Sequence, residues 1–323
     1  MPTVQSETKF IKSEDDKKIF CKHWFSEEKP RALIFLCHGL GEHCLWYDDL
    51  AEALVHIGFY VFSHDHVGHG QSDGIHNHVD DFDEYTSVIF QHCNEVKNKY
   101  PDLRLFIFGH SMGGAITLLA ATSQLDFFKG VITSGPAIVA ISSMLPIKVF
   151  VGKILARIMP LYKIENIQSC QISHDQEQVK RYEEDPMVHP FIRVKWGAAW
   201  LECVKKLEER MDSIEFPLLA LHGDADTLCD VKGSQILYDK AKSEDKEIKV
   251  SVKGSQILYD KAKSEDKEIK VGVKGPQILY DKAKSEDKEI KIYKGLYHSL
   301  LLELEEDRKK VLNDILEWLK KRM

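Results

Sequence analysis

The 323-residue sequence predicts an α/β fold in which a mostly parallel sheet carries helices on both faces. Two observations support this fold class. Short apolar runs such as Ala32–Cys37 recur along the chain, and continuous apolar runs are typical of strands buried on both faces. Segments with helical spacing separate several of these runs, so strands and helices alternate as a parallel sheet requires.

The first two strands are expected at 9–12 and 18–24, as a hairpin around Asp15 and Asp16. Helices are expected at 47–57, which Gly58 ends, and at 81–100, which Pro101 ends. Two further helices are expected at 115–120 and 307–321. The remaining strands are expected at 32–37, 59–63, 105–108, 130–134, 217–222 and 289–293.

Residues 135–216 interrupt this alternation and are expected to form a cap of helices and loops. The sequence therefore divides into a core at 1–134, a cap at 135–216 and a second core part at 217–323. One cap segment, 147–159, is very apolar but carries Lys148, Lys153 and Arg157. Two interpretations stay open: a cap helix packed on the core, or a surface that touches lipid with its basic residues at the headgroups.

A tandem repeat fills residues 231–293. Its period is 21 residues, because the string that begins at Val231 returns at Val252 and, nearly unchanged, at Val273. Each copy has the pattern of one helix and one strand. Structural repeats normally drift at surface positions, so near identity indicates a recent duplication or a defect in the assembled gene model.

Composition excludes some classes of protein. The net charge of −7 argues against nucleic acid as the main partner. The seven cysteines form no C-x-x-C pair, which suits a reducing compartment. The N-terminal residues show no apolar signal segment, and no apolar run is long enough to span a bilayer. We therefore expect a cytoplasmic protein.

The segment Gly109-His-Ser-Met-Gly113 fits the G-x-S-x-G nucleophile elbow. A predicted strand precedes it and a predicted helix follows it, as this motif requires. Gly109 and Gly113 suit a sharp turn in which a Cβ atom would collide with neighbouring backbone. Such a turn holds the serine in a strained conformation and exposes its hydroxyl. Ser111 is therefore the predicted nucleophile.

A serine nucleophile needs a histidine base, and that base is oriented by a carboxylate. In this architecture the three residues follow the order Ser, Asp or Glu, His, on loops after strands. Asp226 follows the strand that ends at His222, and His298 follows the last predicted strand. These two residues are the predicted acid and base.

Two other aspartates, Asp224 and Asp230, compete with Asp226, although Asp224 can instead serve as a cap of its turn. Several histidines lie in turns near the predicted site without following the last strand. They are expected to stabilise turns or line the pocket: His38, His43, His66, His69 and His110. The oxyanion hole is expected from two backbone N–H groups, those of Met112 and Leu40.

Four motifs carry a family resemblance: His38–His43, His64–Ser72, Gly109–Gly114 and His222–Asp226. Together they resemble the monoacylglycerol lipase family of the α/β-hydrolase fold. The resemblance implies an eight-stranded sheet, a helical cap that contacts membranes, and hydrolysis of monoglycerides to fatty acid and glycerol. It implies no metal and no organic cofactor. It also implies the roles given above for Ser111, Asp226, His298, Leu40 and Met112.

The repeat departs from this family pattern, which has one helix–strand unit between acid and base. If every copy added a strand in order, His298 would move outward by two strands, roughly 10 Å. We therefore expect only the third copy, at 290–293, to occupy the sheet edge, with the other copies looping into solvent.

Alternative functions remain open at this point. Within the same chemistry, the chain could be a lysophospholipase or a general carboxylesterase, because the cap pocket rather than the motifs sets the substrate. In another class, it could be a catalytically silent hydrolase scaffold that the repeat has disrupted.

Overall fold

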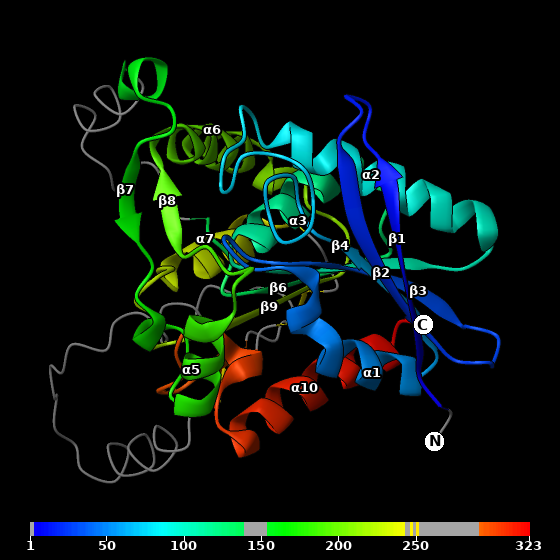
Figure 1. Cartoon of the computed structure of the whole chain (residues 1–323). Coiled ribbons are helices and arrows are strands. Elements are labelled where there is room, and N and C mark those ends of the chain that lie inside the picture. Colours follow the sequence, from blue (N-terminus) through cyan, green and yellow to red (C-terminus); the bar gives the residue numbers. More distant parts are fainter. Residues whose placement is uncertain (1–2, 139–153, 243–245, 248–249, 252–290) are drawn as a thin grey trace, which may run out of the picture.

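The computed structural model describes residues 3–138, 154–242, 246–247, 250–251 and 291–323 (Figure 1). One central sheet organises them. Its strands lie in the order β1 (Gln5–Lys12), β2 (Lys18–Phe25), β4 (Phe59–His64), β3 (Ala32–Cys37), β5 (Leu105–His110), β6 (Gly130–Ser134), β9 (Leu218–Gly223), β12 (Lys291–Tyr293) and β11 (Val250–Ser251). A further strand, β10 (Lys246–Glu247), also pairs with β9.

Within the described part of this sheet, β1–β2 and β2–β4 are the antiparallel pairs and the others are parallel, so the predicted hairpin and the mostly parallel sheet are confirmed. The eight strands from β1 to β12 in this order are those expected from the sequence. The strands β10 and β11 come from the repeat and are two residues long.

Helices cover both faces of the sheet, as predicted (Figure 1). On one face α1 (Asp48–His56) and α10 (Glu305–Lys320) bury apolar residues against the strands. On the other face lie α2 (Asp83–Lys99), α3 (Met112–Ser123), α6 (Val194–Arg210) and α7 (Lys232–Lys240). Short 3-10 turns join these elements at Cys44–Tyr47, Ser169–Gln171, Met211–Ser213 and Leu300–Leu302.

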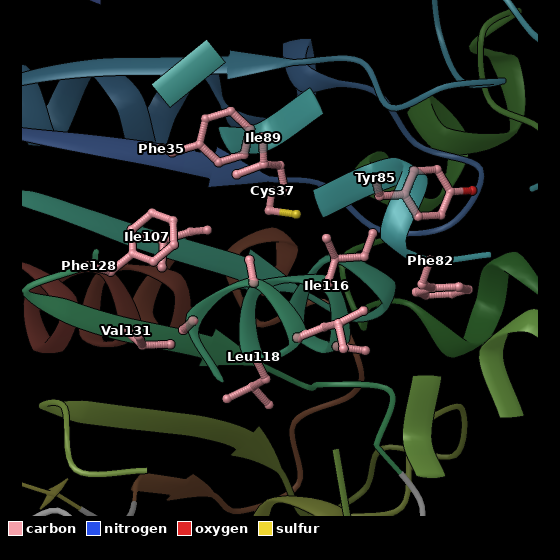
Figure 2. Close-up of a cluster of buried hydrophobic side chains, with 14 of the residues drawn as sticks. Phe35, Cys37, Phe82, Tyr85, Ile89, Ile107, Ile116, Leu118, Phe128 and Val131 are labelled. Carbon is pink, nitrogen blue, oxygen red and sulfur yellow. The ribbon is translucent and has the colours of Figure 1, made fainter. Parts of the chain in front are cut away.

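The larger core cluster lies between the sheet and helices α2 and α3 (Figure 2). Phe35 and Ile107 enter it from the sheet, Ile116 from α3 and Ile89 from α2, and all four are fully buried. Each such side chain contributes about 1.5–3 kcal/mol relative to its exposed state. Helix α3 is buried along nearly its whole length, so the turn that begins it is held on a rigid support.

The cap differs from its prediction in one respect. Besides α5 (Gln176–Glu184) and α6, it contains an antiparallel pair of strands, β7 (Lys163–Asn166) and β8 (Phe191–Arg193). The sequence predicted helices and loops only, because the exposed β7 has the polar composition of a loop. Residues 139–153, which hold most of the apolar segment at 147–159, lie outside the described residues. The cap boundaries at 135 and 216 stay a prediction.

The prediction for the repeat is partly wrong. The third copy does supply β12 beside β9, as expected. The first copy, however, does not leave the sheet: its β10 pairs with the beginning of β9, and its β11 pairs with β12. The sheet position beside β9 is therefore shared between the first and the third copy. The second copy and the rest of the third, at 252–290, lie outside the described residues.

The register explains this sharing. Val250 pairs with Ile292 and Ser251 with Tyr293, so the paired residues occupy equivalent repeat positions, two periods apart. The strand sequences of the copies are nearly the same, and only the third copy ends in an aromatic residue. Tyr293 is buried, and its hydroxyl donates a hydrogen bond of 2.8 Å to Asp314 of α10. This anchor retains the third copy beside the end of β9.

Candidate active site

The predicted elbow is a tight turn between β5 and α3. Ser111 has φ 54° and ψ −119°, a backbone conformation that residues with a side chain rarely adopt. Such conformations cost about 1–3 kcal/mol and persist where the surroundings enforce them. Here the Ser111 N–H donates to the Ser134 carbonyl at 2.9 Å, and the Ser111 carbonyl accepts from the Ala137 N–H at 3.0 Å. The strain holds the hydroxyl toward the cavity that Ser111 lines.

The two elbow glycines leave no room for a side chain. A Cβ atom on Gly109 would lie 2.2 Å from the Gly113 carbonyl oxygen. A Cβ atom on Gly113 would lie 2.2 Å from the Cys37 carbonyl oxygen of β3. Both obstacles are backbone atoms, so the turn closes only because these positions are glycine.

The structure brings Asp226 and His298 together despite the 72 residues between them. The His298 Nδ1–H donates to Asp226 Oδ2 at 2.7 Å. The other carboxylate oxygen, Oδ1, accepts from the N–H groups of Leu228 and Cys229 at 2.8 and 2.9 Å. Burial raises the pKa of Asp226, but hydrogen bonds from His222 and His298 outweigh it and hold that pKa well below the usual carboxyl range.

The two competing aspartates bind backbone instead. The Asp224 carboxylate accepts a hydrogen bond from the Gly295 N–H, and so ties the loop after β9 to the loop after β12. The Asp230 carboxylate accepts from the Lys232 N–H at 2.9 Å, at the beginning of α7. Asp226 is the aspartate whose carboxylate contacts His298.

A cavity of about 670 Å³ lies between the core and the cap. Ser111, His298, Leu40 and Met112, all predicted from the sequence, line it together. Within the described residues, the backbone N–H groups of Leu40 and Met112 have no hydrogen-bond acceptor. The rest of the lining is mostly apolar and comes largely from the cap, including Ile164, Ile167, Ile192, Trp196, Trp200 and Leu201.

Glu42 is a residue of this site that the sequence analysis did not single out. Its Oε2 accepts hydrogen bonds of 3.0 Å from the Gly39 N–H and from the Tyr47 hydroxyl. These bonds fix the loop that carries Leu40. Glu42 itself lines the cavity, where it is a charged group on a mostly apolar wall. The three-residue spacing from Gly39 to Glu42, which lets the carboxylate reach the Gly39 N–H, could have indicated this contact.

His222 is the second residue that the sequence analysis missed, because it was interpreted only as the end of a strand. Its Nε2 lies 3.2 Å from Asp226 Oδ2, and its side chain is fully buried. The four-residue spacing from His222 to Asp226 across a turn could have indicated this contact.

The turn histidines stabilise loops, as expected. The His38 Nδ1–H donates to the Gly39 carbonyl at 2.8 Å, and His38 Nε2 accepts from the His66 N–H at 2.9 Å. His43 lies 2.9 Å from Asp185 and so links the core to the cap. His110 lies beside His298, with ring centroids 4.7 Å apart, and burial lowers its pKa to about 4. His110 is therefore neutral near pH 7.

The described residues include no metal site and no membrane-spanning helix. No group of histidine, cysteine, aspartate and glutamate side chains there could hold a metal ion. None of the described helices has the length and apolar character needed to cross a membrane. All seven cysteines are free.

Comparisons with known proteins give the family. A protein-family model described as serine aminopeptidase, S33 matches residues 28–254. The monoglyceride lipase of Rattus norvegicus is 35% identical over 311 residues, which cover 96% of this chain and 89% of the relative. The chain belongs to the monoglyceride lipase family. The monoglyceride lipase of Mus musculus is 33% identical over the same shares of both chains.

A solved structure from the same family agrees with the fold. The crystal structure of Paleococcus ferrophilus monoacylglycerol lipase superposes with a TM-score of 0.71 at 26% identity, and the match covers 99% of this chain and 100% of that chain. The resemblance inferred from the four motifs is thus confirmed, together with the α/β-hydrolase fold.

Proposed function

We propose that this member of the monoglyceride lipase family is a serine hydrolase that cleaves monoacylglycerol to free fatty acid and glycerol. In the first half-reaction, His298 takes the proton of Ser111, whose oxygen attacks the ester carbonyl carbon. Asp226 orients the imidazole and stabilises its charged form. The N–H groups of Leu40 and Met112 bind the oxyanion. His298 then gives the proton to glycerol, which leaves an acyl-enzyme on Ser111.

In the second half-reaction, His298 takes a proton from water, and the resulting hydroxide attacks the acyl carbonyl. The oxyanion collapses, the bond to Ser111 breaks, and His298 returns the proton to the serine oxygen. The fatty acid leaves. These steps need no metal and no organic cofactor, in line with the expectation from the family.

One observation carries this proposal: the Asp226–His298 contact at the wall of the cavity that Ser111 lines. The repeat could have separated these residues, yet the third copy keeps its place beside β9. This observation favours an active enzyme over a silent scaffold.

The size and the lining of the cavity suit a lipid substrate with an uncharged head group. Its volume lies within the usual range for ligand pockets, and its lining is mostly apolar. The charged side chains of the lining include Glu42 near the nucleophile and Glu165 in the cap. A lysophospholipid would bring a phosphate into this cavity, and like charges in a desolvated site cost several kcal/mol. A glycerol head carries no such charge.

Hydrolysis rates on three substrates test the proposal. We expect kcat/KM for a long-chain monoacylglycerol to exceed that for the matching lysophospholipid by at least about 10-fold, the equivalent of about 1.4 kcal/mol. A short soluble ester should also be slower, because it leaves most of the cavity unfilled. A preference for the lysophospholipid or for the short ester would replace the proposal with lysophospholipase or general carboxylesterase activity.

We further propose that the protein is cytoplasmic and binds membranes peripherally through cap residues 154–164. Several large apolar side chains are exposed there, with Ile158 the most exposed at 71%. Arg157 and Lys163 lie among them, at positions suited to lipid headgroups. Leu155 and Ile164 are exposed and also line the cavity, so this surface lies at the route by which a lipid would enter.

Binding to vesicles that contain anionic lipid tests this surface. Ile158→Glu is expected to lower the fraction of protein bound by about 10-fold, since it places a charge where an apolar side chain would be buried in the membrane. Leu125→Glu is the matched control, because Leu125 is an exposed apolar residue outside the cap. Equal effects of the two changes would contradict the assignment of the cap as the membrane surface.

A further inference from the structure

His222 has two polar contacts that involve the same ring nitrogen. Its Nε2 lies 2.9 Å from the Cys229 carbonyl oxygen and 3.2 Å from Asp226 Oδ2. Both oxygens are acceptors, so Nε2 must carry a proton and donate to both. The other ring nitrogen, Nδ1, lies 2.7 Å from the Ser234 hydroxyl. In the neutral ring Nδ1 is an acceptor, and the Ser234 O–H therefore donates to it.

These contacts complete the environment of the Asp226 carboxylate. Its Oδ1 accepts from two backbone N–H groups, and its Oδ2 accepts from His298 and His222. Two of these donors lie on the turn after β9, one on the loop after β12 and one on β9 itself. Without His222, Oδ2 would keep only His298, the partner that must turn and change its charge during the reaction.

We propose that His222 is a positioning residue of the hydrolase, held in its Nε2–H tautomer by Ser234, and that it fixes the Asp226 carboxylate against His298. Its hydrogen bond restrains rotation of the carboxylate and takes up part of its negative charge. The inference rests on the roles proposed above for Asp226 and His298. His222 does not touch the reacting atoms and acts through Asp226.

Through the contact between Ser234 and His222, the first copy of the repeat contributes to the site. Ser234 belongs to α7, the helix of the first copy, and it is buried against His222. The equivalent position is Ser255 in the second copy and Pro276 in the third. Proline has no hydroxyl, so Pro276 of the third copy cannot perform this function. The first copy thus supports the acid, while the third copy carries the strand that leads to His298.

Full-chain variants of His222 provide the test. His222→Leu replaces the ring with an apolar side chain of similar volume and so removes the donor. His222→Gln instead retains an N–H donor near the Nε2 position. We expect His222→Leu to lower kcat by about 10- to 100-fold with KM little changed, as is typical for loss of a group that orients another. His222→Gln should recover most of this loss.

The pH profile separates positioning from packing. With the donor gone, the whole charge of Asp226 acts on His298, and the acid limb of the kcat/KM profile should move to higher pH in His222→Leu. The other titratable side chains near this pair are His110, Glu42 and the thiol of Cys229, and these variants leave all three in place. An equal loss in both His222 variants, or an unmoved acid limb, would overturn the inference.

Ser234 supplies a second test in case His222→Leu fails to fold. Ser234→Ala should reduce kcat and move the acid limb in the same direction, and Ser234→Thr, which keeps a hydroxyl, should restore both. An unchanged profile in Ser234→Ala would refute the role of the pair. The rate of fluorophosphonate labelling is measured in parallel, since it does not depend on the natural substrate. Absence of labelling in the wild type would instead contradict the proposed function.

Discussion

Replacement of Ser111 by alanine is expected to lower kcat for monoacylglycerol by about a million-fold and to abolish fluorophosphonate labelling. The reason is that in the proposed mechanism the oxygen of Ser111 forms the acyl-enzyme bond in the first half-reaction, and the second half-reaction breaks that bond. The thiol of Cys229 also lines the cavity, but burial raises its pKa and keeps it protonated. The measurement is steady-state hydrolysis together with mass detection of the labelled protein.

The control is the same substitution at the other end of helix α3. Ser123→Ala removes a hydroxyl that bonds only the Ala120 carbonyl, and it should leave both activity and labelling unchanged. A graded comparison comes from Asp226→Asn, for which a loss of about 10⁴-fold is expected, because an amide no longer holds the imidazole in the correct tautomer. A folded wild-type protein that takes no label would establish the silent scaffold in place of the enzyme.

The sequence was sufficient to predict those parts of the site that depend on local geometry. Gly109 and Gly113 predict the elbow because only a residue without Cβ tolerates the neighbouring backbone, and the structure has carbonyl oxygens at those positions. Asp226 and His298 could be chosen because parallel strands deliver their following loops to one edge of the sheet. Their contact at 2.7 Å follows from the pairing of β9 with β12.

The remaining features could not be predicted because they depend on choices between equivalent local structures. The three copies of the repeat have nearly the same strand sequence, so local pattern cannot decide which copy pairs with β9. Tertiary contacts decide it: Tyr293 is buried and bonds Asp314, and the equivalent positions of the other copies are Ser251 and Gly272. The strand β7 was missed for a related reason, since four exposed residues carry no alternation that distinguishes a strand from a loop.

The largest effect on stability is expected from acid. Ten histidines of the described residues are buried, and burial lowers the pKa of seven of them. The pKa values of His23 and His64 fall to about 3, and those of His69 and His110 to about 4. The others whose pKa is lowered are His38, His66 and His92. This burial could not be predicted from the sequence, because histidine is intermediate between buried and exposed residue types and its position in an element does not decide which it is.

Three of these histidines lie in a buried chain of ring contacts that ends at Tyr60. His64 Nδ1 lies 3.3 Å from His92 Nδ1, His92 Nε2 lies 3.2 Å from His23 Nε2, and His23 Nδ1 lies 2.9 Å from the Tyr60 hydroxyl. One proton on each ring satisfies all these contacts. Burial disfavours the charged form of each of these rings, so the folded protein keeps them neutral.

The direction of the pH effect follows from these pKa values. In the unfolded chain a histidine binds a proton near pH 6.5, whereas in the folded protein it does so only near pH 3 to 4. Between these limits the unfolded state holds more protons, so stability is full above pH 6.5 and falls as the pH is lowered. Each of the four histidines with a folded-state pKa near 3 to 4 costs about 1 kcal/mol for every pH unit between 6.5 and that pKa, and the other three act in the same direction.

Urea unfolding measured at pH 7.5, 6.5, 5.5 and 5.0 tests this expectation. The summed cost at pH 5.5 is comparable to the whole stability of a typical domain, about 5–15 kcal/mol, so we expect unfolding without urea close to that pH. The slope of the unfolding free energy against pH gives the number of protons taken up, which should reach at least four near pH 5.5. A free energy that stays constant from pH 7.5 to 5.0 would mean that these rings accept protons while the core remains folded.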